Sequence, residues 1–311
     1  MPPTRTDAPL VAVIGPTGVG KSDVAVALAE VWIGEIVSAD SRALYRGMDI
    51  GTAKPSPADR RRVPHHLIDV ADPREPWSLA QYRAAALEAI GGIHERGHLP
   101  FLVGGTGQYI TALIEGWRPP ARPAGDTRRL ELEAEAGRDG AQALHRRLAR
   151  IDPASADRVD PRNVRRVVRL IEIAETEGRP ASEIRRAEPP PYRVFRLGLT
   201  LPRPELYARL DRRLEGMLEA GFVEEVGRLL EQGLGSKDPV MSAIGYRQVA
   251  EHLEGKVPLD EALQRIRRAN RTLVRHQANW FKADDPRITW FDAREGVEER
   301  ASGAIVAWIG E

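Results

Sequence analysis

The chain has 311 residues, of which 42% are hydrophobic, so it is long enough for one large domain or two of ordinary size. Its net charge of +1 excludes a global field that would steer it to nucleic acid or membrane, and the absence of cysteine excludes disulfides, thiolate zinc sites and cysteine nucleophiles. The N-terminus lacks the apolar core of a signal peptide and no window approaches about 18 apolar residues, so we expect a soluble, cytoplasmic protein without membrane contact.

Strand-like and helix-like runs alternate in the first third of the chain. Strand-like runs span residues 10–15, 34–40 and 99–105; each is followed by a helix-like run, at 21–32, 41–47 and 106–116, and 78–97 is also helix-like. Such alternation predicts a parallel sheet covered by helices. Ligands of such sheets bind at the carboxyl ends of the strands, where residues 15–22, Asp40 and residues 104–106 would lie.

Prolines and glycines interrupt the chain at residues 117–126 and again at 187–193. The segment between them is rich in Arg and Glu and contains no strand-like run, which indicates short helices. A strand-like run at 192–201, mostly helical sequence and a last strand-like run at 287–292 follow. We therefore predict an α/β fold. A P-loop-type parallel sheet core, covered by helices, comprises residues 1–120 and 190–311, and an inserted all-helical domain comprises residues 121–189.

The sequence GPTGVGKS, directly after the first strand-like run, predicts a phosphate-binding turn that opens a helix. Glycines let backbone amides approach an anion, the helix N-terminus adds partial positive charge, and Lys21 adds a full charge. The Ser22 hydroxyl would ligate Mg²⁺. The alternative is an ordinary glycine turn. The residues assigned to this diphosphate or nucleotide site are Gly15, Pro16, Thr17, Gly18, Val19, Gly20, Lys21 and Ser22.

An acidic residue that ends a buried strand and holds Mg²⁺, as in typical P-loop NTPases, is missing. The strand-like run 99–105 ends in glycine, and Asp69 stands in a poor setting for that role. This lack weakens an interpretation as an ATP hydrolase.

Asp40 ends the second strand-like run, close to where the phosphate-binding turn must lie. A carboxylate there suits a general base, but it suits the N-cap of a following helix equally well. Arg46 and Lys54 add cations to the same loop or simply face solvent. The second glycine-rich turn, GGTGQYI, would bring its backbone and the Thr106 hydroxyl close to a ligand, although it also fits a plain tight turn.

Two stretches carry arginines at helical spacing. Arg162, Arg166 and Arg169 form one stripe with few acidic neighbours, opposite an apolar face. The second stripe consists of Arg268, Arg271 and Arg275, opposite a side that we expect to be buried and that contains Ile266, Ala269, Leu273 and Trp280. Two such stripes favour a groove for a polyanion such as RNA over two solvated faces.

Two further positions leave alternatives open. Arg247 comes two positions after a glycine and suits either a phosphate clamp or an ordinary surface arginine. His65 and His66 are adjacent, so their side chains point in different directions, and a structural role is favoured over a metal pair.

Together these motifs resemble the bacterial tRNA dimethylallyltransferases of the IPP transferase family. The resemblance covers residues 10–292 and is carried, in the family's order, by GPTGVGKS, SADSRALYRGMDIGTAKP, HHLIDV, FLVGGTGQYI, DPRNVRRVVRLIEI, MSAIGYRQ and RTLVRHQANWF. Asn270 and His276 depart from the family pattern, and the lack of cysteine excludes the zinc finger of eukaryotic members.

The resemblance implies transfer of a dimethylallyl group from its diphosphate to the exocyclic amine of the adenosine 3′ to the anticodon, in tRNAs that read codons beginning with U. Diphosphate would leave, so the glycine turn would hold a leaving group with the help of Mg²⁺. The implied partners are the anticodon arm of tRNA and dimethylallyl diphosphate. We expect a monomer, because no long apolar helix face is left unexplained.

The same resemblance implies roles for individual residues. Asp40 would be the general base, Thr106 would contact the adenine or the diphosphate, and Arg247 would neutralise charge on the leaving group. The resemblance leaves open whether Arg128 or Arg129 contacts the tRNA. The other residues expected on the tRNA side are Asp40, Ser41, Arg42, Ala43, Thr106, Arg165, Arg166, Val167, Val168, Arg169, Arg271, Arg275 and Gln277.

Three other functions compete with this interpretation. One is a P-loop kinase of a small metabolite, in which the helical insertion acts as a lid. Another is an adenylate isopentenyltransferase, which would not need the insertion. The third is an NTP-gated RNA-binding module without catalytic activity, which would depend on the arginine stripes alone.

Overall fold

The computed structural model describes residues 7–117, 126–184 and 190–310. They form two compact units, which we call the sheet unit (residues 7–77, 81–114 and 190–310) and the helical unit (78–80, 115–117 and 126–184). The domain boundaries predicted after residues 120 and 189 involve residues outside the described ones.

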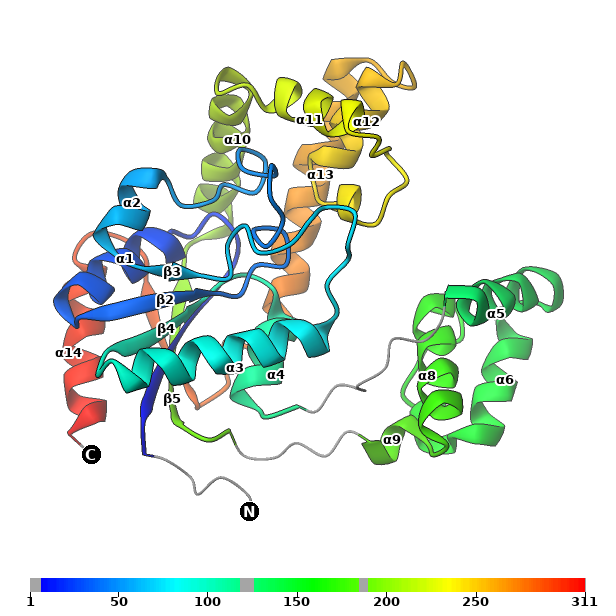
Figure 1. Ribbon diagram of the computed structural model, residues 1–311, viewed down its shortest axis with the longest axis horizontal. Helices are drawn as coiled ribbons and strands as arrows, with labels where there is room; N and C mark the ends of the chain where they lie inside the picture. The colour runs from blue at the N-terminus through cyan, green and yellow to red at the C-terminus, as the bar shows by residue number, and fades with distance from the viewer. Residues whose placement is uncertain (1–6, 118–125, 185–189, 311) are drawn as a thin grey trace. The chain divides into compact units, whose positions relative to one another are not determined.

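The sheet unit contains one six-stranded sheet in which all neighbouring strands are parallel, in the order β3-β2-β4-β1-β5-β6 (Figure 1). This confirms the predicted α/β class. The strands are β1 (Pro9–Ile14), β2 (Gly34–Ser38), β3 (His65–His66), β4 (Leu99–Val103), β5 (Arg193–Thr200) and β6 (Ile288–Asp292). The central position of β1 brings the glycine turn that follows it to the middle of the sheet's carboxyl edge.

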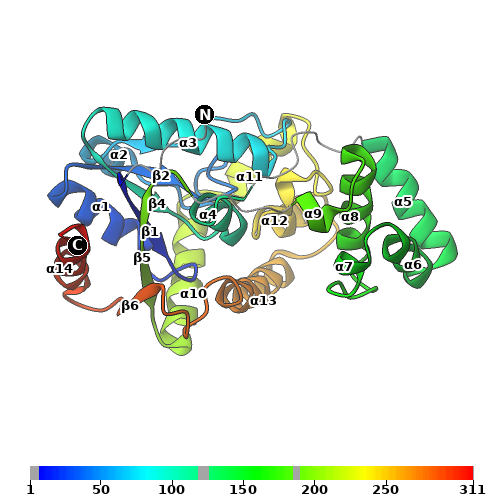
Figure 2. The same ribbon diagram turned by 90° about the horizontal axis from the view of Figure 1, so that it is seen from below.

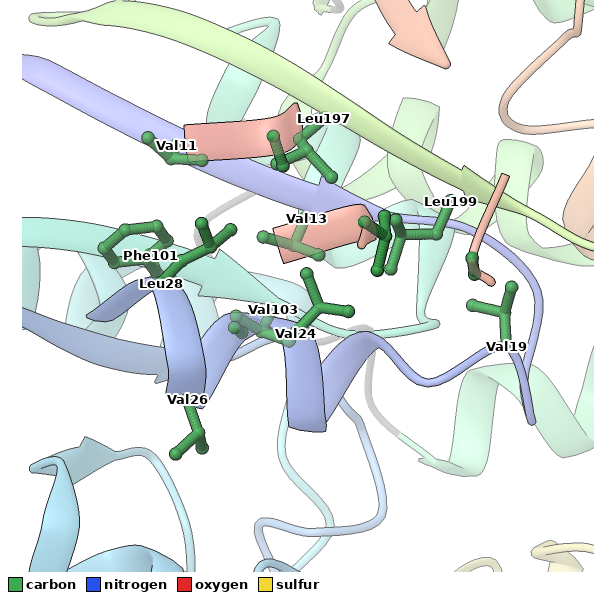
Figure 3. Packing of buried hydrophobic residues seen from close by; sticks show 14 of the residues in the cluster. Val11, Val13, Val19, Val24, Val26, Leu28, Phe101, Val103, Leu197 and Leu199 are labelled. Atoms are coloured by element: carbon green, nitrogen blue, oxygen red, sulfur yellow. The ribbon is translucent and has the colours of Figure 1, made fainter. Parts of the chain in front are cut away.

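Helices cover both faces of the sheet (Figure 2). On one face, alternate residues of β1 and β4 pack against α1 (Lys21–Val31); Val11, Val13 and Phe101 meet Val24 and Leu28 there (Figure 3). This alternation is what a half-turn per residue along a strand dictates. The same core includes residues of α10 (Arg203–Glu219) and α14 (Val297–Ile309). The opposite face carries α3 (Leu79–Glu95) and α4 (Gly107–Ile114).

The remaining elements of the sheet unit are mostly helical. They are α2 (Pro57–Arg62), α11 (Phe222–Glu231), the 3₁₀ helix η1 (Val240–Ser242), α12 (Tyr246–Leu253) and α13 (Leu259–Ala278). Within the described ranges, no helix combines the length and apolarity that crossing a bilayer requires.

The helical unit contains α5 (Asp126–Asp139), α6 (Ala141–Ile151), α7 (Pro153–Ala156), α8 (Val164–Glu177) and α9 (Ala181–Ile184). Its own apolar core includes Leu144, Leu148 and Ile171. Asp152 is fully buried beneath it and accepts hydrogen bonds from the backbone N–H groups of Ser155 and Ser182. One carboxylate thus satisfies backbone N–H groups in the first turns of two short helices, α7 and α9.

Two local predictions are wrong. The helix-like run at residues 41–47 is a series of turns, because Asp40 Oδ1 accepts from the N–H groups of Arg42 and Ala43 and Tyr45 bridges to Ala71. Trp280, expected on the buried side of a basic helix, is 44% exposed. Since α13 ends at Ala278, helical spacing no longer dictates where residue 280 points.

Candidate active site at the carboxyl edge of the sheet

The turn between β1 and α1 has a backbone that only glycine adopts readily. Gly15, Gly18 and Gly20 have φ angles of 144°, 80° and 100°. A Cβ atom on Gly15 would lie 2.5 Å from the carbonyl oxygen of Leu199, so close approach to β5 also requires glycine there. The turn leads into the N-terminus of α1, where backbone N–H groups and the helix dipole favour an anion.

The Lys21 ammonium lies inside this turn. Its Nζ donates to the carbonyl oxygens of Gly15, at 3.0 Å, and Pro16, at 2.8 Å. Burial lowers the pKa of Lys21 to about 8, although the negative charge of Asp40 acts in the opposite direction. The turn therefore positions the Lys21 ammonium beside the N-terminus of α1, and Asp40 lies close enough to affect the pKa of Lys21.

Asp40 and Thr106 follow the neighbouring strands β2 and β4, and hydrogen bonds join the two strand ends. The Thr106 N–H donates to the Ala39 carbonyl at 3.1 Å, and Thr106 Oγ1 accepts from the Ser41 N–H at 3.0 Å. A Cβ atom on Gly104 would lie 2.2 Å from the Ala39 carbonyl oxygen, so this glycine is required for the close approach. The Asp40 carboxylate and the Thr106 hydroxyl are thus fixed at one edge.

One cavity of about 970 Å³ joins these parts. Of the predicted site residues, those that line it are Thr17, Gly18, Gly20, Lys21, Ser22, Asp40, Ser41, Arg42, Ala43, Thr106 and Gln277. Gly15, Pro16 and Val19 shape the turn without lining the cavity, and Val19 is buried in the core of the sheet unit. Several apolar residues complete the lining: Leu210, Leu214, Met217, Phe222, Ile244, Ile266 and Leu273.

Arg213 is a functional candidate that the sequence interpretation missed. It lines the cavity from α10, together with Arg209 one turn earlier, and burial lowers the pKa of Arg213. Its Nη2 donates to the Thr52 carbonyl at 3.5 Å. The available signal was the spacing of Arg209 and Arg213 beside the apolar stripe of α10.

Arg247, predicted as the cation for the leaving group, does not line this cavity. It is the second residue of α12 and is exposed. Gly245, two positions earlier, has a φ angle of 97°, and a Cβ atom there would lie 2.9 Å from the Phe222 ring. The arginines that line the cavity, Arg209 and Arg213, come from α10 instead, and the leaving-group role of Arg247 stays a prediction.

The loop after Asp40 is held by a buried lysine. Lys54 Nζ contacts Asp49 Oδ1 at 2.6 Å and Asp69 Oδ1 at 2.5 Å, and it donates to the Tyr45 carbonyl; its side chain is 2% exposed. Burial opposes ionisation of Asp69, but the bonds from Lys54 and Arg60 prevail and lower its pKa. Lys54 therefore braces the loop instead of facing solvent.

The adjacent histidines differ in their contacts. His65 Nδ1 lies 2.8 Å from the Val63 carbonyl oxygen, and His66 Nε2 lies 2.6 Å from Glu35 Oε2. In the part of the chain that the structure describes, no group of three His, Cys, Asp or Glu side chains has the arrangement of a metal site.

Residues expected to contact tRNA from α13 divide by exposure. Arg271 and Arg275 are exposed; Arg271 lies 3.5 Å from Asp211 and Arg275 donates to Thr272. Gln277 is 6% exposed, and its amide bonds to backbone groups of both glycine turns. Its side chain therefore belongs to the interior of the site.

In the helical unit, acidic side chains hold most of the predicted arginines. Arg128 pairs with Glu175 and Glu131, Arg129 pairs with the buried Glu172, and Arg169 also reaches Glu172. Within the stripe of Arg162, Arg166 and Arg169, Arg162 pairs with Asp160 and Arg169 with Glu172, so the expectation of few acidic neighbours is wrong for two of its arginines. Val167 and Val168 are buried in the unit's core. Arg165 and Arg166 are exposed and make no side-chain ion pair within the described residues.

Comparisons with known proteins agree with this geometry. A family model described as IPP transferase matches residues 43–284. A curated relative from Roseiflexus sp. (strain RS-1), named tRNA dimethylallyltransferase, is 48% identical over 97% of this chain and 99% of its own length. The crystal structure of a tRNA isopentenylpyrophosphate transferase from Bacillus halodurans is 39% identical, with a TM-score of 0.71 over 98% of this chain and 96% of that one. A eukaryotic dimethylallyltransferase described as acting on tRNA is 26% identical, with a TM-score of 0.82 over 97% of this chain and 80% of that one.

Proposed function

The chain belongs to the IPP transferase family, and from this premise we propose that it transfers a dimethylallyl group to tRNA. The acceptor is the exocyclic N6 amine of the adenosine 3′ to the anticodon, in tRNAs that read codons beginning with U. The donor is dimethylallyl diphosphate, and diphosphate is released. The observation that carries this proposal is that one cavity contains both a phosphate-binding turn and a strand-end carboxylate, Asp40.

On the donor side, the turn binds the diphosphate. Backbone N–H groups at the start of α1 and the Lys21 ammonium face the anion, and Arg213 adds a second, half-buried cation. Charge that develops on the diphosphate oxygens as the allylic C–O bond breaks is stabilised by these groups. The apolar lining residues, among them Leu214 and Met217, suit the C5 hydrocarbon of the donor.

Ser22 lies in the first turn of α1 and lines the cavity, next to Asp23, so the residues fit Mg²⁺. Mg²⁺ keeps water ligands and takes few protein ligands beside phosphate oxygens, which agrees with one hydroxyl and a neighbouring carboxylate. When bound, the ion neutralises charge on the diphosphate.

On the acceptor side, Asp40 accepts the proton that the amine loses. The N6 lone pair forms the new N–C bond, the C–O bond to diphosphate breaks, and a proton moves from N6 to the Asp40 carboxylate. Thr106, tied to Ser41 and Ala39, orients the adenine. Because a base in the stack cannot reach a carboxylate inside the cavity, the target adenosine must turn out of the anticodon loop.

The tRNA side involves exposed arginines in both units. Arg271 and Arg275 on α13, with Arg165 and Arg166 on α8, bind phosphates of the tRNA. The carboxylates of Glu175 and Glu172 orient the side chains of Arg128 and Arg129, respectively. We propose that the protein works as a monomer, and a tRNA substrate would place it in the cytoplasm.

The test is to incubate the protein with dimethylallyl diphosphate, Mg²⁺ and unmodified tRNA, and to analyse the nucleosides by mass spectrometry. We expect one added C5H8 unit on the adenosine next to the anticodon, and none on a control tRNA with guanosine at that position. Transfer to free AMP but not to tRNA would overturn the tRNA assignment. Phosphoryl transfer from ATP with no prenyl transfer would overturn the reaction class.

A further inference from the structure

The side chain of Gln277 joins the two glycine turns of the site. Its Oε1 accepts from the Thr17 N–H at 2.8 Å, and its Nε2 donates to the Gly105 carbonyl at 2.9 Å. Since Thr17 offers a donor and Gly105 an acceptor, only one orientation of the amide satisfies both. The three residues come from the turn after β1, the turn after β4 and the last part of α13.

These bonds continue to the acceptor side of the cavity. Gly105 precedes Thr106, whose backbone N–H is bonded to Ala39 and whose hydroxyl is bonded to Ser41. Ala39 and Ser41 flank Asp40. A continuous series of hydrogen bonds therefore runs from the diphosphate turn through Gln277 to the loop that carries the carboxylate.

The Gln277 side chain is tightly enclosed by its neighbours. The residue is 6% exposed, and a Cβ atom on Gly105 would lie 2.5 Å from Nε2. Two residues later, at the start of α4, a Cβ atom on Gly107 would lie 2.2 Å from the Trp280 ring. The glycines of the second turn thus provide room for side chains from the end of α13.

We propose that Gln277 is a positioning residue that fixes the spacing between the diphosphate turn and the Asp40–Thr106 side of the cavity. This inference rests on the proposed prenyl transfer. The reacting amine and allylic carbon must approach to near-contact distance, and a misplacement of about 1 Å between such groups can cost about 100-fold in rate. Gln277 acts through the two turns, and it does not belong to the protein surface that binds tRNA.

The first test compares Gln277→Met, which keeps the length but loses both bonds, with Gln264→Met, an exposed position on the same helix. We expect kcat at saturating substrates to fall about 10- to 100-fold in Gln277→Met, while the Kd for tRNA changes less than about threefold. The control should match the wild type. A weaker Kd for tRNA with unchanged kcat would mean that Gln277 belongs to the RNA surface, and no change in either would also overturn the proposal.

Gln277→Glu gives a second readout that a general loss of packing would not produce. An ionised carboxylate accepts from Thr17 but cannot donate to the Gly105 carbonyl, whereas a protonated carboxyl can do both. The activity of this variant, divided by that of the wild type at the same pH, should therefore rise as pH falls from 8 to 5.5. A flat ratio in a folded variant contradicts the proposed pair of bonds.

Hydrogen exchange separates failure of this inference from failure of the proposed function. The Thr17 amide should exchange faster in Gln277→Met than in the wild type or Gln264→Met, whatever reaction the protein catalyses. If the wild type does not prenylate tRNA, the function falls while this measurement still decides the bond. Equal exchange in all three proteins overturns the bridge itself.

Discussion

Two carboxylates five residues apart, Glu35 and Asp40, stand at opposite ends of β2 and have opposite surroundings. Glu35 is 3% exposed and contacts His66, His98 and two nitrogens of Arg96, all within 2.8 Å. The bonds from Arg96, then those from the two histidines, lower its pKa to about 2 against the effect of burial. Among the residues that the structure describes, the hydrogen-bond donors to the Asp40 carboxylate are the backbone N–H groups of Arg42 and Ala43, both to Oδ1.

The difference separates a structural acid from a reactive one. A carboxylate whose lone pairs are all taken by charged or imidazole donors stabilises the fold and has no capacity left for a substrate. Asp40 Oδ2 has no hydrogen-bond partner within residues 7–117, 126–184 and 190–310, and the residue lines the cavity. The amino edge of the sheet is therefore closed by ion pairs, whereas the carboxyl edge keeps an acceptor available.

The largest expected effect comes from Asp40→Asn. The amide retains an oxygen for the bonds from Arg42 and Ala43 but cannot take the proton from N6, so kcat should fall about 10³-fold. The free energy of unfolding and the Kd for tRNA should change little, as measured by urea denaturation and filter binding. Near-normal kcat would remove Asp40 from the chemistry, and a loss confined to tRNA binding would assign Asp40 to RNA binding instead.

Arg213 and Arg247 provide the next comparison. Arg213→Gln removes a half-buried cation from the cavity, so the rate constant of transfer should fall about 100-fold in single-turnover assays at saturating tRNA. Arg247→Gln removes an exposed cation outside the lining and should change kcat less than about fivefold. The reverse ranking would support the leaving-group role predicted for Arg247 and place the leaving group nearer α12.

The sequence was informative wherever one residue type is the only one that fits. Gly15, with its left-handed backbone and its contact with Leu199, could be placed from spacing alone, as could the strands around it. Asp40 could be located but not assigned, because N-caps and bases share one residue type. The loop after it looked helical, but side-chain to backbone bonds prevailed over helix propensity.

Arg213 and Gln277 could not be placed for a different reason. Both lie on long amphipathic helices far along the chain from the turns they reach, and helical spacing gives a face without naming the partner across it. The pairing of Arg129 with Glu172, 43 positions away, was equally invisible. The fold could be predicted almost fully, whereas contacts between distant helices and turns needed the structure.

The lowered pKa of Lys21 predicts that binding of the diphosphate at the carboxyl edge of the sheet depends on pH. Its pKa is lowered to about 8, so above that pH the free protein loses the ammonium and binding of the anion must take up a proton. The Kd for dimethylallyl diphosphate, measured by calorimetry without tRNA, should be flat below about pH 7.5 and rise up to about tenfold per pH unit above 8. Lys21→Arg keeps its charge throughout and should remove this rise, and a rise of equal size in that variant would assign it to another group.

Glu35→Gln should have the smallest effect on activity. The pKa of Glu35 in the folded protein is about 2, below its ordinary value of 4.5. The ionised carboxylate therefore contributes its full stabilisation above about pH 5, and this stabilisation is lost as the pH falls from about 4.5 to about 2. Urea denaturation should show the variant about 1–3 kcal/mol less stable at pH 7. The difference in free energy of unfolding between the wild type and Glu35→Gln should become smaller below about pH 4.5. The kcat per folded molecule should stay within about twofold of the wild type. A large fall in kcat with unchanged stability would mean that the two ends of β2 are coupled and that the contrast between Glu35 and Asp40 does not hold.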